Sequence, residues 1–323
     1  MLCFVGVRIV DRIAFIFPGQ ASQFVGMAND FHSTHTAAEE LFSKANDLLG
    51  FDLAKICFHG PDERLRETDV TQPAVFVHSV IVSRLLEAEG ISPSIVAGHS
   101  LGEYSALVAA GALEFEDAIV LVRERSRSML EVGISNQGTM AAVIGLDAIE
   151  VSRLCELSSD IGVVVPANFN APEQTVISGV PRAVNHVGEL CKEAGAKRVV
   201  GLSVSGAFHS PLMTNASHRM RHLLENANML RPRIPVVTNV SAKKIDDPDI
   251  LTNDLITQIT HSVNWTESME ALLASNVDLV VEVGPGQVLR GLMRRISRDI
   301  QVACVGTVEE FTELLALIKG DRK

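Results

Sequence analysis

The stretch that decides the fold is Ile95-Val96-Ala97-Gly98-His99-Ser100-Leu101-Gly102-Glu103. Its apolar first residues predict a buried strand, and residues 103–110 favour a helix. Between them lies the pattern Gly-x-Ser-x-Gly, in which Gly98 and Gly102 leave room for a sharp turn around Ser100. A strand, a tight turn and a helix in this order are typical of a nucleophile elbow, which lifts the serine hydroxyl above a sheet edge. The alternative is a glycine-rich turn capped by a serine.

The composition sets limits on the class of protein. The chain has 323 residues, of which 47% are hydrophobic and 21% charged, enough for one large domain or two unequal ones. No apolar run reaches the roughly 18 residues that a membrane-spanning helix needs. Residues 1–10 are apolar but lack the basic start and the cleavage pattern of a signal peptide. The net charge of −11 disfavours a nucleic-acid partner.

The cysteines indicate the compartment. They are odd in number, scattered and never in Cys-x-x-Cys spacing: Cys3, Cys57, Cys155, Cys191 and Cys304. This distribution argues against a disulfide framework or a zinc site and favours a reducing, cytoplasmic environment. We therefore expect a cytoplasmic protein without a metal. No coiled-coil heptads appear, so we also expect a monomer.

Apolar periodicity predicts an α/β body interrupted by a different pattern. Before the interruption we expect a strand at 13–17, helices at 37–49 and 72–88 (with Pro73 in the first turn of the second), the elbow, and a helix at 116–132. The interruption consists of strand 139–144, helix 148–157, strands 162–167 and 174–177, helix 182–194 and strand 197–204. The body then resumes with helix 211–228, strand 234–239, helices 249–260 and 266–274, strand 279–283, helix 288–296, strand 302–305 and helix 308–318.

The β-α-β-β-α-β order of the interruption is the split-βαβ, ferredoxin-like signature. The sequence thus predicts a discontinuous catalytic domain of residues 1–136 and 205–323, and a small subdomain of residues 137–204. Such an insertion leaves a cleft between two bodies, where ligands commonly bind.

A serine nucleophile needs a base, and Ala207-Phe208-His209-Ser210-Pro211 offers one. His209 follows a strand-like run and precedes a helix that begins with proline, so we expect it in a loop at the same sheet edge as Ser100. The order Ser…His matches that of α/β hydrolases. The alternative is a capping or surface histidine. No carboxylate between Ser100 and His209 lies at an obvious strand end, and a carbonyl can orient the imidazole equally well. Such a pair should be a weaker base toward water, which favours transfer over hydrolysis.

Several blocks resemble the malonyl-CoA:acyl-carrier-protein transacylases, an acyltransferase family. The three signature blocks are Phe-Pro-Gly-Gln-Ala-Ser-Gln at 17–23, Gly-His-Ser-Leu-Gly-Glu-Tyr-Ser-Ala-Leu at 98–107 and Gly-Ala-Phe-His-Ser at 206–210. Residues 168–170, 235–240 and 282–286 resemble further blocks, so the match runs in order from about Ile13 to Arg295. The resemblance implies an α/β-hydrolase-like body with an inserted ferredoxin-like subdomain, the layout that the periodicity also predicts.

The resemblance also implies roles for individual residues. Ser100 would be the nucleophile and His209 the general base, with the imidazole oriented by the backbone carbonyl of Gln258. The backbone N–H groups of Gln20 and Leu101 would form the oxyanion hole.

Arg125 corresponds to the arginine that binds the malonyl carboxylate, and a planar guanidinium can hold a carboxylate in a bidentate way. Without the resemblance, Arg125 would be interpreted as a solvated charge on a helix face. Asn168 and Asn170 are expected to line the acyl or pantetheine channel, and Gln72 is placed similarly.

Two residues bear on the acyl group. Leu101 after the nucleophile and the Gly-Ala-Phe-His block resemble the pattern that selects malonyl over methylmalonyl, and Phe208 is expected to narrow the space beside the α-carbon. One methyl group is worth only about 1–3 kcal/mol in a pocket, so this is a preference and not an exclusion.

The implied reaction is ping-pong transfer of malonyl from malonyl-CoA, through a malonyl-serine, to the pantetheine thiol of acyl carrier protein in type II fatty acid synthesis, without a cofactor. Because carrier proteins are acidic like this chain, docking requires a local basic patch. The candidates, which could also be ordinary solvated charges, are Lys192, Lys197, Arg198, Arg294, Arg295 and Arg298. Three alternatives stay open: a stand-alone malonyl acyltransferase of a polyketide synthase, a serine hydrolase such as a thioesterase, and a non-catalytic interaction module.

Overall fold

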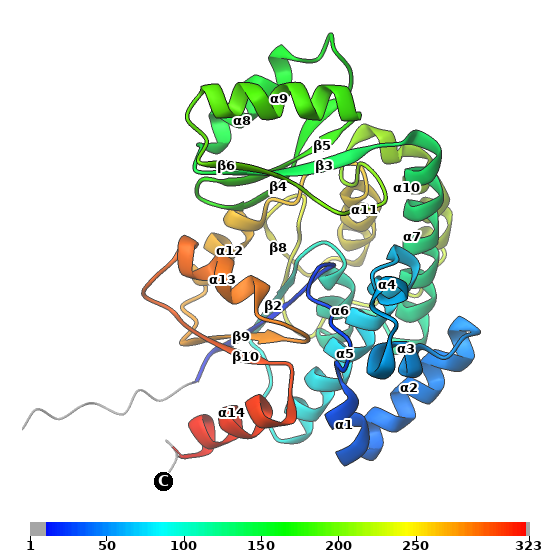
Figure 1. The fold of residues 1–323 in the computed structure, drawn as a ribbon. Coiled ribbons are helices and arrows are strands. Elements are labelled where there is room, and N and C mark those ends of the chain that lie inside the picture. Colours follow the sequence, from blue (N-terminus) through cyan, green and yellow to red (C-terminus); the bar gives the residue numbers. More distant parts are fainter. Residues whose placement is uncertain (1–10, 321–323) are drawn as a thin grey trace, which may run out of the picture.

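A computed structural model describes residues 11–320 and contains two sheets (Figure 1). The larger sheet has the strand order β10-β9-β1-β2-β7-β8. Its strands are β1 (Ile13–Phe17), β2 (Ile95–Gly98), β7 (Val236–Val237), β8 (Lys244–Ile245), β9 (Leu279–Val283) and β10 (Gln301–Val305). The first five in this order run parallel, and β8 is antiparallel to β7. Their carboxyl ends therefore meet at one edge, where ligands of α/β proteins commonly bind.

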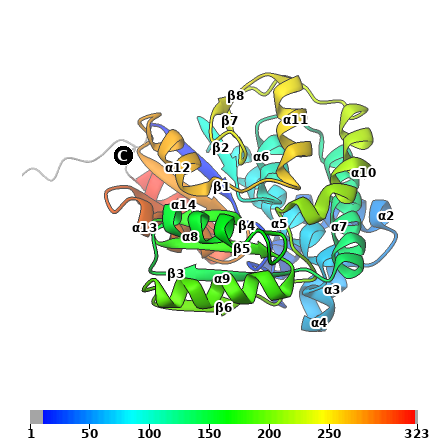
Figure 2. The same cartoon turned by 90° about the horizontal axis from the view of Figure 1, so that it is seen from above.

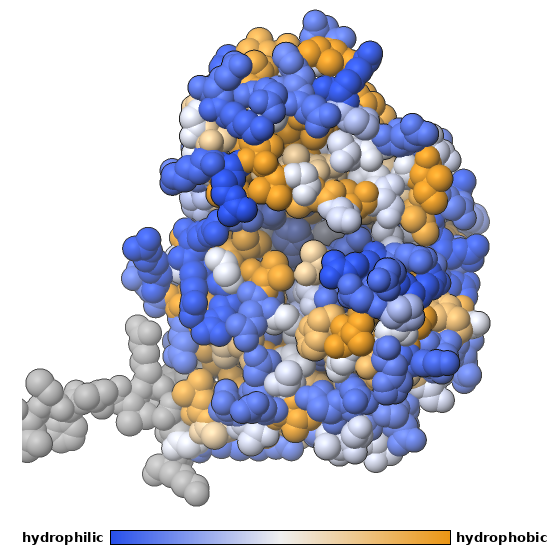
Figure 3. Space-filling view, in the orientation of Figure 1, coloured by the Kyte–Doolittle hydropathy of each residue, from blue (hydrophilic) through white to orange (hydrophobic). Residues whose placement is uncertain are grey.

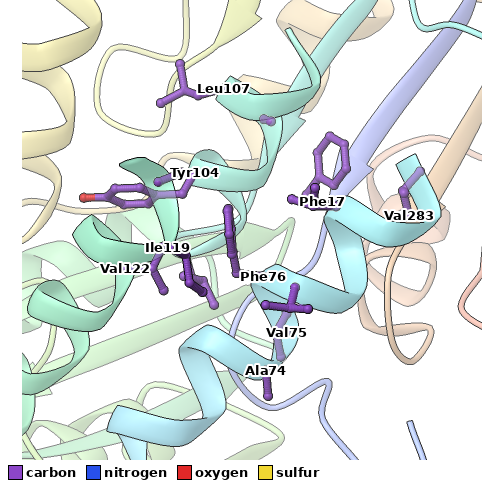
Figure 4. Packing of buried hydrophobic residues seen from close by; sticks show 14 of the residues in the cluster. Phe17, Ala74, Val75, Phe76, Tyr104, Leu107, Ile119, Val122 and Val283 are labelled. Atoms are coloured by element: carbon purple, nitrogen blue, oxygen red, sulfur yellow. The ribbon is translucent and has the colours of Figure 1, made fainter. Parts of the chain in front are cut away.

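Helices cover both faces of this sheet, which explains why β1 is buried at every residue. Phe15 and Phe17 belong to a buried cluster with residues of α5 (Thr68–Ala88), α6 (Gly102–Ala109) and α7 (Phe115–Asn136). Figure 4 shows Phe17 among residues of these helices. Ala14 and Ile16 point to the other face, against α12 (Trp265–Leu273) and α13 (Val288–Ile296). The alternation follows from the two-residue period of a strand.

The smaller sheet lies above the body in the view of Figure 1. It has the order β4-β5-β3-β6 and is seen from above in Figure 2. Its antiparallel strands are β3 (Thr139–Ile144), β4 (Val164–Ala171), β5 (Gln174–Gly179) and β6 (Arg198–Gly201). Two helices, α8 (Ala148–Leu157) and α9 (Pro181–Glu193), pack on it through their own apolar cluster. The predicted β-α-β-β-α-β order is confirmed, and the fold is an α/β-hydrolase-like body with an inserted ferredoxin-like unit.

Backbone hydrogen bonds join the smaller sheet to the body. In β4 the N–H of Phe169 donates to the carbonyl of Val263 at 2.9 Å, and the N–H of Val263 donates to Ala167 at 2.9 Å. Val263 follows α11 (Pro248–Gln258) closely along the chain. The segment that ends in Gln258 is thereby anchored to the smaller sheet.

The remaining helices complete the body. They are α1 (Asn29–Thr34), α2 (Thr36–Leu49), α3 (Leu53–His59), α4 (Asp62–Leu65), a 3-10 turn (Pro211–Met213), α10 (Thr214–Glu225) and α14 (Val308–Gly320). Within residues 11–320, every helix is too short or too polar to span a lipid bilayer. The apolar residues 1–10, with Cys3, lie outside the described residues.

Some predicted element bounds were wrong. The helix expected at 72–88 begins at Thr68, because the carbonyl of Glu67 accepts the N–H groups of Val70 and Thr71. Pro73 therefore lies inside the helix and not in its first turn.

Strand bounds also differ. The strand expected at 234–239 pairs only at Val236–Val237, and that expected at 162–167 is Val164–Ala171. The strand expected at 197–204 ends at Gly201, and the helix expected at 211–228 is the 3-10 turn followed by α10.

Candidate active site

Ser100 lies in a strained turn between β2 and α6. Its φ of 51° is in the left-handed region, which residues other than glycine rarely adopt. A Cβ atom on Gly98 would lie 1.9 Å from the carbonyl carbon of Gly102, and a Cβ on Gly102 would lie 2.1 Å from the oxygen of Phe17. Both positions therefore require glycine, as the geometry of a nucleophile elbow demands.

His209 contacts Ser100 directly. The Oγ atom of Ser100 lies 2.8 Å from Nε2 of His209, and Nδ1 of His209 lies 2.8 Å from the backbone oxygen of Gln258. A carbonyl can only accept, so Nδ1 carries the proton and Nε2 is left to accept the hydroxyl proton of Ser100. The sequence-predicted pair and its carbonyl partner are thus brought together.

The imidazole of His209 is kept neutral. Burial of the ring, assisted by the positive charge of Arg125, lowers the pKa of His209 to about 3. At neutral pH the ring therefore has a free electron pair on Nε2, which a general base requires.

Arg125 is fully buried beside the nucleophile. Its Nη2 donates to Oγ of Ser100 at 3.1 Å and to Oε1 of Gln258 at 2.8 Å, while Nη1 donates to Oε1 of Gln72 at 2.7 Å. Within residues 11–320 it forms no ion pair, and its buried Nε has no acceptor. A buried cation without a carboxylate partner is costly, so this site favours an anionic ligand.

Two backbone N–H groups are free where an oxyanion hole is expected. In the described part of the chain, the N–H groups of Gln20 and Leu101 donate to no protein acceptor. Gln20 follows β1 and Leu101 precedes α6, so both lie at the carboxyl edge of the sheet. The arrangement can stabilise negative charge on a carbonyl oxygen.

The other predicted site residues differ in what they contact. Gln72 contacts Arg125 as described, and Phe208 is buried next to His209 in the chain. Asn168 is buried in β4, whereas Oδ1 of Asn170 lies 2.8 Å from Nε2 of His99 and links the smaller sheet to the elbow. That Asn168 and Asn170 line a channel stays a prediction.

Sequence reasoning did not single out two polar residues at the centre of the site. Glu103 is fully buried, and Asn239 donates its backbone N–H to that carboxylate at 3.0 Å. The signal for Glu103 was its place in the first turn of the helix that follows the elbow, three residues after Ser100. Asn239 belongs to residues 235–240, one of the blocks that resemble the family. A strand was expected at 234–239, and a strand pattern gives no indication that Asn239 contacts the elbow.

A pocket of about 360 Å³ reaches His209 from outside. Its other lining residues are Val165, Pro211, Thr214, Thr260, His261 and Ser262. Figure 3 shows the surface hollowed between the upper unit and the body. Residues 11–320 contain no cluster of side chains suited to hold a metal ion, and the four cysteines among them are free and buried.

Comparisons with known proteins agree with this geometry. Residues 14–310 match the family described as acyl transferase domain. The chain is 39% identical to the malonyl CoA-acyl carrier protein transacylase of Bacillus subtilis, over 97% of this chain and 99% of that protein. It is 43% identical to the protein of the same name from Escherichia coli K12, over 89% and 93% of the two chains.

Solved structures give the same result. The malonyl CoA-acyl carrier protein transacylase of Coxiella burnetii superposes with a TM-score of 0.93 at 37% identity, covering 96% of this chain and 98% of that one. A malonyl-transacylase in complex with a type II polyketide synthase acyl-carrier protein superposes with a TM-score of 0.91 at 38% identity, covering 96% and 100%. The chain therefore belongs to the acyltransferase family of the malonyl CoA-acyl carrier protein transacylases.

Proposed function

We propose that this protein transfers malonyl from malonyl-CoA to the pantetheine thiol of acyl carrier protein through a malonyl ester on Ser100. The observation that carries the proposal is the buried guanidinium of Arg125, which forms no ion pair with a carboxylate of residues 11–320 and whose Nη2 lies 3.1 Å from Oγ of Ser100. In a malonyl thioester, one methylene group separates the carboxylate from the reacting carbonyl. One acyl group can therefore bind Arg125 and meet Ser100 at the same time.

The first half-reaction forms the malonyl ester. Nε2 of His209 takes the hydroxyl proton of Ser100 while Oγ attacks the thioester carbonyl carbon. The N–H groups of Gln20 and Leu101 bind the resulting oxyanion. The carbon–sulfur bond then breaks, and His209 returns the proton to the sulfur of coenzyme A.

The second half-reaction reverses these steps with another thiol. His209 takes the proton of the pantetheine thiol, whose sulfur attacks the malonyl ester, and the proton returns to Ser100 as the new thioester leaves. All bonds broken and formed are accounted for by these residues and the two thioesters. We accordingly propose that no cofactor takes part.

Transfer is favoured over hydrolysis by the same geometry. The partner of Nδ1 of His209 is a neutral carbonyl, whereas hydrolases place a carboxylate there. A thioesterase would also gain nothing from a buried arginine that selects acyl groups with a carboxylate. We expect Phe208 to favour malonyl over methylmalonyl, although the gain is limited to about 1–3 kcal/mol.

The carrier protein and the pathway form a separate part of the proposal. We place the enzyme in type II fatty acid synthesis, supported by the bacterial relatives named above. The alternative, a polyketide carrier protein, is favoured by the complex among the similar structures. Kinetics with holo carrier proteins of the two kinds would discriminate between them, because the preferred one gives the higher kcat/KM.

We propose that basic residues among the candidates given above take part in docking. Lys192 and Lys197 form ion pairs with Glu189 and Glu173, which reduces their contribution. Within residues 11–320, the candidate arginines (Arg198, Arg294, Arg295 and Arg298) form no ion pair. We further propose a cytoplasmic monomer with the domain division at residues 136 and 205, as the sequence predicts.

The experiment that tests the proposal measures where malonyl goes. The enzyme is mixed with malonyl-CoA and either holo carrier protein, apo carrier protein without the pantetheine thiol, or no carrier. Of the two carrier proteins, we expect only the holo form to gain malonyl, with little free malonate in any reaction. Rapid release of malonate without a carrier would show a hydrolase, and no reaction at all would favour a non-catalytic module.

A further inference from the structure

Glu103 is a fully buried carboxylate that contacts neither of the reacting atoms. It lies in the first turn of α6, three residues after Ser100. Its Oε2 accepts two hydrogen bonds, from the backbone N–H of Asn239 at 3.0 Å and from Nε2 of Gln258 at 2.9 Å. One oxygen therefore joins two segments that are far from α6 in the sequence.

The first of these segments holds the elbow. Oδ1 of Asn239 accepts the N–H of Ser100 at 2.6 Å, and Nδ2 of Asn239 donates to the carbonyl of Gly98 at 2.6 Å. The two peptide groups lie on either side of His99, just before the left-handed Ser100. The side-chain amide of Asn239 therefore hydrogen-bonds both peptide groups. These two bonds hold the strained backbone of the elbow in the conformation that directs the Ser100 hydroxyl toward His209.

The second segment holds the base and the arginine. Nε2 of Gln258 donates to the carboxylate of Glu103 and to the carbonyl of Ser100 at 3.0 Å, so the amide nitrogen faces the elbow. Its Oε1 must then face Arg125, and it accepts from Nη2 at 2.8 Å. The backbone oxygen of the same residue orients His209.

We propose that Glu103 and Asn239 are positioning residues of the acyl transfer, Asn239 acting on the nucleophile and Glu103 on both the nucleophile and the acyl-selecting Arg125. The proposal rests on the proposed function, because it assigns these two residues to the acylation of Ser100. The simpler reading is that Glu103 only stabilises the amino terminus of α6, where a carboxylate is favourable. That reading predicts changes in stability and none in selectivity.

The two residues should differ in which kinetic quantity they change. Asn239→Ala removes the two side-chain hydrogen bonds to the elbow and leaves the contacts of Arg125 intact. It should slow acylation of Ser100 by malonyl-CoA and by acetyl-CoA to the same extent, about 10- to 100-fold. Glu103→Ala also frees the amide of Gln258 to turn, so the malonyl rate should fall more than the acetyl rate, and their ratio should drop about tenfold.

Conservative variants separate hydrogen bonding from a general loss of packing. Glu103→Gln keeps an oxygen in the place of Oε2 and should recover at least tenfold of the malonyl rate lost in Glu103→Ala. Glu282→Gln is the matched control, since Glu282 is also a buried carboxylate that accepts two backbone N–H groups, those of Leu289 and Arg290. It should lower the melting temperature without changing the ratio of the two acylation rates.

The experiment measures the rate of acyl-serine formation per folded molecule by rapid-quench mass spectrometry, with both acyl-CoA substrates, alongside thermal unfolding. If Glu103→Ala does not fold, Glu103→Asp takes its place, because the shorter side chain withdraws the accepting oxygen from Asn239 and Gln258, and Asn239→Ala tests the elbow by itself. Folded Asn239→Ala and Glu103→Ala (or Glu103→Asp) variants with the wild-type rates and ratio would overturn the proposal, as would an equal loss of ratio in Glu282→Gln. A wild-type enzyme that forms no acyl-serine would instead refute the proposed function.

Discussion

Nη2 of Arg125 lies 3.1 Å from Oγ of Ser100, so the group proposed to bind the malonyl carboxylate and the proposed nucleophile share one site. The two residues come from α7 and from the elbow, 25 positions apart in the chain. Because the positive charge of Arg125 also lowers the pKa of His209, a carboxylate bound to Arg125 should offset that charge. A malonyl substrate would then strengthen the base that activates Ser100.

Replacing Arg125 should change the acyl selectivity of the enzyme. Arg125→Ala removes the charge-assisted hydrogen bonds to the malonyl carboxylate, each worth about 1.5–3 kcal/mol. We expect kcat/KM for malonyl-CoA to fall about 100-fold, and that for acetyl-CoA to change much less. Arg125→Lys keeps the charge but not the planar fork, and should lie between the two. Equal losses with both substrates would contradict the assignment.

Acylation should persist in mildly acidic solution. The pKa of His209 is lowered from 6.5 to about 3, so the ring stays unprotonated as the pH falls from 7 to 5. The single-turnover rate of Ser100 acylation should therefore show no decline near pH 6.5. A decline centred there would mean that the base is solvated and not buried.

The same shift predicts how stability depends on pH. Between the two pKa values the unfolded chain binds a proton at His209 that the folded chain does not, so the folded state loses stability as the pH falls from about 6.5. The melting temperature of wild type minus that of His209→Gln should decrease over this range. A constant difference would argue against the lowered pKa.

The glycines of the elbow allow a paired test. Gly98→Ala would place a Cβ 1.9 Å from backbone atoms of Gly102, and should cost more than about 3 kcal/mol of unfolding free energy or prevent folding. Gly291→Ala is the control, because Gly291 lies in α13 with open space around it. It should stabilise the protein by about 0.5–1 kcal/mol. Denaturant unfolding of both variants measures the contrast.

Local patterns predicted much of the fold. The elbow strand and the two helices of the smaller unit, α8 and α9, have apolar patterns that match their burial, whereas the residues of β6 are exposed or half-buried. The short helices α3 and α4 and the two-residue strand β8 were not predicted, because segments of two to seven residues hold too little periodicity. The start of α5 was predicted four residues too late. Proline is typical of the first turn of a helix, so Pro73 indicated a start at residue 72, whereas α5 begins at Thr68.

The site was only partly predictable for a physical reason. Arg125 lies on a helix in a run of charged residues, where periodicity alone predicts a solvated side chain, yet it is fully buried. Its interpretation depended on the family resemblance. Glu103 and Asn239 act through hydrogen bonds that span 136 and 155 positions of the chain, and no local pattern reports such pairs.

The central claim is that Ser100 carries the malonyl group between two thiols. Intact-protein mass spectrometry after brief incubation with malonyl-CoA, with wild type beside Ser100→Ala, tests it most directly. The account predicts one malonyl adduct on the wild type alone, which disappears when holo carrier protein is added and reappears as malonyl on the carrier. An adduct on Ser100→Ala, or free malonate in place of any adduct, would contradict it.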